Sequence, residues 1–204
     1  MRQRIYNWLK ENPRIKKKVH YCLVHPNRSR PRWWVRTFIM PFLIKKGKGA
    51  YISSKVRRDL YPFNSFQIGY KSIIEDYATL NNGMGPIRIG DNCIIGIGCI
   101  ILGDITIGNR VGTGQYCIFT GLNHNYETLN TPFDQQGAYS DPIVIEDDVA
   151  TGSHVIILPG VRIGTHSMIS AGSVVTRSIP PYSLVSGNPA KVVFNFKTGK
   201  RVIE

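Results

Sequence analysis

The chain has 204 residues, 42% of them hydrophobic, which is enough for one main domain with a buried core. Its net charge of +13 is unevenly distributed, because residues 1–58 contain 17 Lys and Arg but one acid, whereas the rest of the chain is mildly acidic. No secretory leader is visible, and the apolar stretch 33–44 is shorter than the roughly 20 residues of a membrane span, so we expect a cytoplasmic protein.

Residues 1–58 are predicted to form a basic, partly helical extension. Basic residues, including the run Lys16-Lys17-Lys18, are interleaved with aliphatic residues and with Trp8 and Trp33. This mixture favours a segment that lies on an anionic membrane surface, and the same segment could also cap the first coil of a solenoid. We expect no nucleic-acid partner.

A six-residue repeat occupies most of the remaining chain. Its first positions are aliphatic in most hexads, its second position is usually Gly, and its fifth is small or β-branched. The first positions are Ile89, Ile95, Ile101, Ile107, Thr113, Phe119, Ile145, Thr151, Ile157, Ile163, Ile169 and Val175. This period predicts an all-β solenoid, a parallel β-helix over residues 59–193, in which Gly permits a backbone geometry that other residues resist.

Two interruptions of the repeat are predicted to leave the spiral. The step from Leu80 to Ile89 contains three extra residues, and the step from Phe119 to Ile145 contains a long loop at about 122–142. A long loop expelled from a regular scaffold is usually functional. Residues 194–204 form a short C-terminal tail.

The cysteines and histidines of the repeat region limit the kinds of site that the chain can form. Three of the four cysteines occupy fifth positions, where a small buried side chain is expected, and no C-x-x-C spacing exists. His154 and His166 are fourth residues two hexads apart, so they are expected on different faces. We therefore predict no metal site, which argues against a metal-dependent hydratase on the same scaffold.

The second half of the chain resembles the hexapeptide-repeat acetyltransferases, in the branch of the galactoside, maltose and surface-polysaccharide O-acetyltransferases. The resemblance covers about residues 68–193. It is carried by Asn123-His124-Asn125-Tyr126, Gln136-Gly137, the run from Pro142 to Val149, Gly172-Ser173-Val174-Val175-Thr176 and Gly187-Asn188-Pro189-Ala190-Lys191. The resemblance implies a left-handed β-helix, a homotrimer, and acetyl-CoA bound in the cleft between neighbouring subunits.

By this resemblance, His124 in the expelled loop is the general base that takes the proton of an attacking hydroxyl. An unperturbed imidazole, which titrates near 6.5, suits that role. Glu127 is a candidate to orient His124, and Asn82 is a candidate for the acceptor-side or oxyanion asparagine. No acyl-enzyme is needed, because a thioester is already activated.

The resemblance also implies contacts to coenzyme A. The matching residues are Ser153, Ala171, Thr176, Arg177 and Lys191. The chain departs from the family at Ala150, where an aromatic residue, usually Trp, is common, and the missing ring is expected to alter the shape of the cleft.

We therefore expect an O-acetyltransferase that acts on a glycan or lipid-linked sugar in surface-polysaccharide assembly. The alternatives are an acetyltransferase for a small soluble acceptor, such as a sugar, an antibiotic or an amino sugar, and a non-catalytic solenoid that docks on a membrane.

Overall fold

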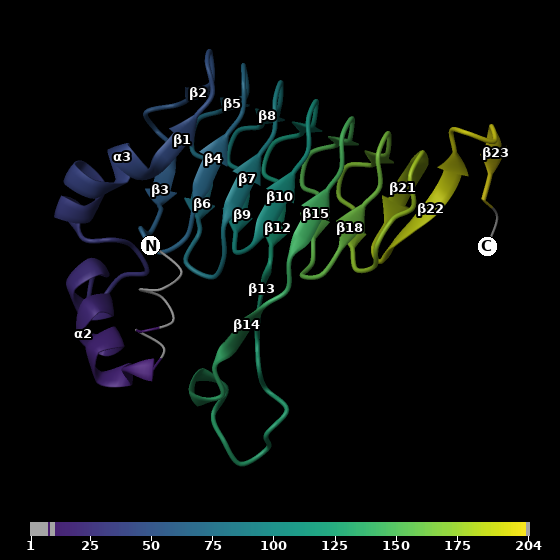
Figure 1. Cartoon of the computed structure of the whole chain (residues 1–204). Coiled ribbons are helices and arrows are strands. Elements are labelled where there is room, and N and C mark those ends of the chain that lie inside the picture. The colour runs from purple at the N-terminus through teal and green to yellow at the C-terminus, as the bar shows by residue number, and fades with distance from the viewer. Residues whose placement is uncertain (1–7, 9–10, 203–204) are drawn as a thin grey trace.

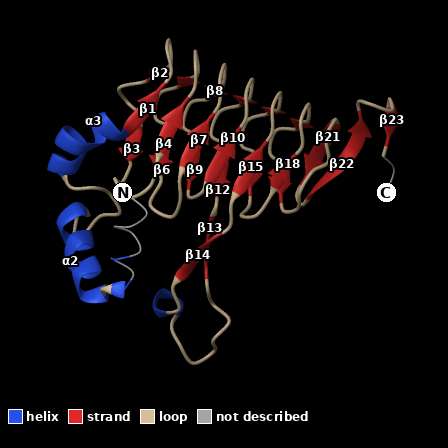
Figure 2. Cartoon of the chain, viewed as in Figure 1, coloured by secondary structure: helices blue, strands red, loops and turns tan. Residues whose placement is uncertain are grey.

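The computed structural model describes residue 8 and residues 11–202. These residues form a left-handed parallel β-helix with a helical cap at its N-terminal end and an antiparallel hairpin at its C-terminal end (Figures 1 and 2). Three parallel sheets form the three faces of the prism, and each coil adds one short strand to each face. The fold class predicted from the hexads is confirmed.

The strands follow one another around the prism in a fixed order. The first face contains β1 (Ile44–Lys46), β4 (Phe66–Ile68), β7 (Ile87–Ile89), β10 (Ile105–Ile107), β15 (Ile143–Ile145) and β18 (Arg162–Ile163). The second contains β2 (Tyr51–Ile52), β5 (Ile73–Ile74), β8 (Ile94–Ile95), β11 (Gly112–Thr113), β16 (Ala150–Thr151), β19 (Met168–Ile169) and β21 (Ser183–Gly187). The third contains β3 (Arg57–Asp59), β6 (Thr79–Asn81), β9 (Ile100–Leu102), β12 (Ile118–Thr120), β17 (Ile156–Ile157) and β20 (Val174–Val175). Strands β22 (Ala190–Asn195) and β23 (Lys200–Arg201) extend the second face in antiparallel fashion.

First-position side chains stack in the core, because parallel pairing in register places them above one another. Ile89, Ile107 and Ile145 pair in this way along the first face, and each is at most 2% exposed. The fifth-position cysteines are fully buried, as predicted. Their thiols also donate hydrogen bonds to second-position glycine carbonyls of the next coil, over Sγ–O distances of 3.0 Å (Cys93–Gly108), 3.1 Å (Cys99–Gly114) and 3.2 Å (Cys117–Gly152).

The second-position glycines have a different role from the predicted one. They are absent from the positive-φ glycines of the described chain, so the expectation that they supply unusual backbone geometry is wrong. A Cβ on Gly96 would instead lie 2.6 Å from the carbonyl oxygen of Gly114 in the next coil. The glycines are thus required because adjacent backbones approach too closely for a side chain. Positive φ occurs at fourth positions, including those of Arg110 and His154.

The three edges of the prism differ in length. We call the corner between the first and second faces the first edge, that between the second and third faces the second edge, and the return to the first face the third edge. The first and second edges hold four residues in each coil, as in 90–93 and 96–99. The third edge varies from 103–104 to 121–142, and both predicted interruptions lie there.

Among the described residues, the elements before the first coil include the helix α2 (Pro13–Leu23), the π-helix η1 (Val35–Ile39) and the short helix α3 (Met40–Leu43). Val35 and Met40 belong to the buried core cluster, and Arg30 forms an ion pair with Asp59 of β3 at 3.4 Å, so this segment covers the end of the β-helix. None of the described helices is long and apolar enough to cross a membrane.

The first coil begins at Ile44, inside the segment that charge and composition set apart as an extension. The hexad pattern does not reveal it, because charged residues stand at two of its first positions. Lys46 pairs in register with Ile68, and Arg58 pairs with Leu80. Both charged side chains are exposed, which the terminal coil permits.

Candidate functional site

The expelled loop is an arm that leaves the third edge as a two-stranded hairpin. Strand β13 (Leu122–His124) pairs in antiparallel fashion with β14 (Ala138–Ser140), and the connecting segment contains the short 3-10 helix η2 (Phe133–Gln135). In Figure 1 this arm projects away from the body of the β-helix. At its base, the Asp141 N–H donates a hydrogen bond to the Gly121 carbonyl at 3.0 Å, which returns the chain to the same corner.

His124 is the last residue of β13 and is exposed, opposite Ala138 in the hairpin. Its ring meets Phe133 edge to face, with centroids 6.1 Å apart, and its backbone N–H donates to the Asn123 side-chain oxygen at 3.0 Å. An exposed imidazole held by an aromatic neighbour is accessible to a substrate hydroxyl and is limited in its orientation. Phe133 was not singled out from the sequence.

The end of the arm is organised by the Gln136 side chain. Its oxygen accepts the Thr128 N–H at 3.0 Å, and its nitrogen donates to the carbonyls of Thr128 at 2.9 Å and Thr131 at 2.6 Å. The Asn125 amide donates to the Gln136 carbonyl at 3.0 Å. Both residues belong to the motif that carries the family resemblance, and their observed role is to shape the backbone around His124.

The two other proposed catalytic side chains are placed differently. Glu127 accepts the Tyr126 N–H at 3.1 Å through its carboxylate, which therefore contacts the backbone of its own loop. Asn82 is fully buried: its oxygen accepts the Tyr61 N–H at 2.6 Å, and its nitrogen donates to the carbonyls of Tyr61 at 3.2 Å and Asn64 at 2.9 Å. With both polar atoms bonded to the preceding coil, Asn82 has no group left for an acceptor or an oxyanion, and its assignment as a catalytic residue is corrected to a structural one.

The residues expected to contact coenzyme A lie on two edges of the prism and on the terminal hairpin. Ser153 and Ala171 lie at the second edge, and the Gly172 N–H donates to the Ser153 carbonyl at 2.9 Å. Thr176 and Arg177 follow β20 at the third edge, where the arm also originates, and both are exposed.

Two further features belong to this group. The Ser153 hydroxyl donates to the Gln115 side-chain oxygen at 2.8 Å, a partner that the sequence did not indicate. Lys191 is an exposed residue of β22, opposite Ser186 of β21. Within one chain the candidate donor contacts are therefore spread around the prism.

Ala150 lies on the outer surface of β16, in register with Gly112 and Met168 on the neighbouring strands. The small side chains leave a shallow hollow of about 260 Å³, whose lining also includes Phe196 from the terminal hairpin. The departure from the family at Ala150 thus changes the local surface of the second face.

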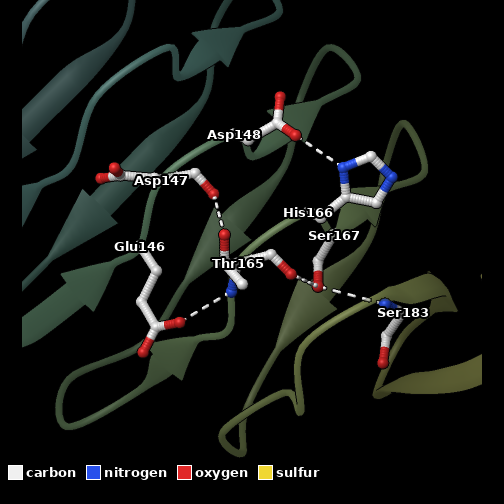
Figure 3. Close-up of polar contacts among 7 residues, drawn as sticks. All are labelled: Glu146, Asp147, Asp148, Thr165, His166, Ser167 and Ser183. Carbon is white, nitrogen blue, oxygen red and sulfur yellow. Dashed lines mark hydrogen bonds and ion pairs between the residues drawn. The ribbon is translucent and has the colours of Figure 1, made fainter. Parts of the chain in front are cut away.

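The acidic run after β15 has a structural role at the first edge (Figure 3). The Glu146 carboxylate accepts the Thr165 N–H at 2.8 Å, and the Thr165 hydroxyl donates to the Asp147 carbonyl at 2.7 Å. Asp148 pairs with the His166 ring. His166 lies at the first edge and His154 at the second, so the two histidines are separated as predicted. No group of three or more His, Cys, Asp or Glu that could hold a metal ion occurs among the described residues.

Comparisons with known proteins agree with this architecture. Residues 142–177 match the family model described as bacterial transferase hexapeptide (six repeats), and residues 86–112 match that described as hexapeptide repeat of succinyl-transferase. A candidate acetyltransferase of Staphylococcus aureus (strain COL) is 43% identical over 111 residues, which are 52% of this chain and 54% of that protein. One from Mycobacterium tuberculosis is 33% identical over 131 residues, covering 63% of this chain and 44% of that protein. The chain thus spans about half the length of the curated relatives it matches.

Solved structures show the same fold over a larger share of the chain. A variant of AntD, an N-acyltransferase of Bacillus cereus in complex with dTDP-4-amino-4,6-dideoxyglucose and coenzyme A, has a TM-score of 0.65 at 22% identity, over 75% of this chain and 83% of that one. A hexapeptide-repeat-containing acetyltransferase of Vibrio cholerae has a TM-score of 0.54 at 25% identity, over 95% and 93%. The same Vibrio cholerae protein in complex with acetyl coenzyme A gives 0.51 at 27% identity, over 76% and 73%.

Proposed function

We propose that this protein transfers an acetyl group from acetyl-CoA to a hydroxyl of a glycan or lipid-linked sugar, with His124 as the general base. The observation that carries the proposal is the arm itself, which presents an exposed imidazole at the edge that also bears Thr176 and Arg177. The names of the Staphylococcus aureus and Mycobacterium tuberculosis relatives, and the acetyl-CoA complex of the Vibrio cholerae protein, support the donor.

The reaction needs only one proton carrier. An unprotonated nitrogen of His124 takes the proton of the acceptor hydroxyl while that oxygen attacks the thioester carbonyl carbon. The tetrahedral intermediate collapses with cleavage of the carbon–sulfur bond, and the imidazolium returns the proton to the leaving thiolate. A positioned base of this kind contributes about 10²–10⁴ in rate. Glu127 would assist by orienting the imidazole if the arm rearranges when substrate binds.

We further propose that the working unit is a homotrimer with acetyl-CoA in the cleft between subunits. Ser153 and Ala171 lie at the second edge, whereas the arm and Arg177 lie at the third. Two edges of one prism face apart, so a site that uses both sets must combine them from neighbouring chains. Arg177 and Lys191 would then neutralise coenzyme A phosphates.

Calorimetric titration of acetyl-CoA into the full-length protein tests the donor. We expect saturable binding at one site per chain, weakened at least several-fold in Arg177→Ala and unchanged in Arg14→Ala, which removes a likewise exposed arginine of α2. Absence of acetyl-CoA binding would contradict the donor assignment, and equal affinity in both variants would contradict the contact assigned to Arg177.

Release of coenzyme A in the presence of oligosaccharide acceptors tests the base. His124→Ala should lower the transfer rate by about 10²–10⁴ and leave acetyl-CoA affinity unchanged. His20→Ala, an exposed histidine of α2, is the control. An unaltered rate in His124→Ala would contradict the assignment of His124 as the base, whereas absence of transfer by the unsubstituted protein would favour a non-catalytic solenoid.

An amine acceptor is the second candidate, because the AntD structure holds an amino sugar nucleotide. Mild alkali separates the two reactions, since it cleaves an ester product and leaves an amide intact.

A further inference from the structure

The segment that caps the first coil has an unusual outer surface. Trp33, which lies two residues before η1, is 70% exposed, Phe38 of η1 is 61% exposed and Phe42 of α3 is 86% exposed. We call these three side chains the aromatic ridge. Large aromatic side chains with this much exposed area are an unfavourable choice for a surface that contacts only water.

Capping does not account for the ridge. The other side of the same segment covers the core: Val35 is fully buried and Met40 is 4% exposed. The end of a solenoid needs this covering and a polar outer side. Here the covering is complete without the aromatic ridge, so the three rings have no role in closing the β-helix.

The helix geometry places the rings together. Residues 35–39 form a π-helix, whose hydrogen bonds connect residues five apart. Trp33 and Phe38 are five residues apart and meet edge to face, with ring centroids 6.0 Å apart. Phe42 follows one helical turn later in α3. Trp33 and Phe38 thus contact each other, and the spacing of four residues between Phe38 and Phe42 places Phe42 on the same side of the helical segment.

Exposed basic residues lie next to the ridge in the sequence. Arg36 lies between its members and Lys45 follows it, and both are exposed. Arg32 connects the segment to the basic helix α2, because its guanidinium lies 5.1 Å from the centre of the Tyr21 ring and its Nε donates to the Tyr21 carbonyl at 3.1 Å. The sequence between Glu11 and Asp59 contains no acidic residue.

We propose that the aromatic ridge inserts into the interfacial layer of an anionic lipid bilayer, with the surrounding Lys and Arg on lipid phosphates. A projecting set of rings fits a fluid lipid surface, whereas a protein partner would have to supply a matching groove. Aromatic side chains favour the bilayer interface, and each nearby Lys or Arg adds attraction to anionic lipid. The inference does not depend on acetyl transfer. The sequence predicted membrane contact for the whole basic extension, and the inference assigns the insertion to the three side chains of the aromatic ridge.

Sedimentation of full-length protein with vesicles tests the inference. The vesicles contain phosphatidylcholine with about 30% phosphatidylglycerol, and the variant combines Trp33→Ser, Phe38→Ser and Phe42→Ser. Each lost ring should weaken partitioning by roughly an order of magnitude, since burial of one large side chain is worth a tenfold change or more. Tyr77→Ser, which removes a 62% exposed aromatic side chain at the second edge, should bind as the unsubstituted protein does. Circular dichroism spectra verify that every variant is folded.

High salt separates insertion from simple charge attraction. At about 0.5 M NaCl the electrostatic part is screened, so the unsubstituted protein should retain measurable binding while the triple variant loses it. Equal binding by both proteins at every salt concentration would overturn the inference, and so would failure of the unsubstituted protein to bind at low salt. If the triple variant no longer self-associated but bound vesicles as before, the ridge would be a contact with a second copy of the chain. That result would also overturn the inference.

Discussion

The reason for glycine in the hexad can be tested within one coil. Gly114 and Gly112 are two residues apart, and neither has a positive φ. A Cβ on Gly114 would lie 2.5 Å from the carbonyl carbon of Gly152 in the next coil, whereas a Cβ on Gly112 would have no heavy atom within 4 Å. Gly172 supplies the complementary case, because it has a φ of +72° and open space around its Cβ position.

Replacement by Ala should therefore have three different effects. Gly114→Ala must separate two backbones that are held by ladder hydrogen bonds, and an overpacked site of this kind costs about 1–3 kcal/mol. Gly112→Ala should be neutral, or should stabilise by about 0.4–1 kcal/mol through the unfolded chain. Gly172→Ala should cost about 1–2 kcal/mol for its left-handed backbone alone.

Urea unfolding followed by circular dichroism gives the three free energies, with the oligomeric state of each variant checked by analytical ultracentrifugation. Gly112→Ala should be at least as stable as the original protein. Gly172→Ala and Gly114→Ala should both be less stable than the original protein. If Gly114→Ala proved as stable as Gly112→Ala, close approach of the coils would not be the reason for glycine at the second position.

Three further predictions follow from individual contacts. Asn82→Ala should lower the free energy of unfolding by about 1–3 kcal/mol, because it leaves buried backbone groups of the preceding coil without partners; a loss of rate with unchanged stability would return Asn82 to the active site. In the native protein, a thiol reagent should modify only the exposed Cys22, and all four cysteines should react in denaturant. The Asn109 N–H donates to Asp147 at 2.8 Å and holds the pKa of that carboxyl below its ordinary value. That stabilisation is present above about pH 4 and is lost as pH falls through the lowered pKa, so Asp147→Asn should unfold more easily at pH 7, and its difference from the original protein should shrink steadily as the pH is lowered below about 4.

The strands and the core could be predicted because the first residue of each hexad points into the core. Ile95 and Ile101 point inward wherever the coil begins, and a period of six leaves no second arrangement. The thiol of Cys93 illustrates what the pattern leaves out: its size predicted burial, but its bond to a carbonyl of the next coil depends on the stacking distance. Burial also raises the pKa of this thiol, which keeps it protonated.

The candidate site was less predictable, because it depends on the path of the segments that interrupt the repeat at the third edge. His124 was identified from its motif, and the structure adds Phe133, which is nine residues away and meets it only because the arm folds back. Asn82 was misassigned for the same reason. The sequence does not predict the path of its turn, and therefore does not show that the Asn82 amide reaches Tyr61 of the preceding coil.

The unequal edges have a consequence for how such a chain can change. At the first two edges an inserted residue would shift every later coil out of step with the one before it, so the length of these corners is fixed. The third edge carries no such constraint, and the chain already places segments as different as 103–104 and 121–142 there. New specificity can therefore be acquired by grafting loops onto one side of the scaffold, with the spiral itself left unaltered.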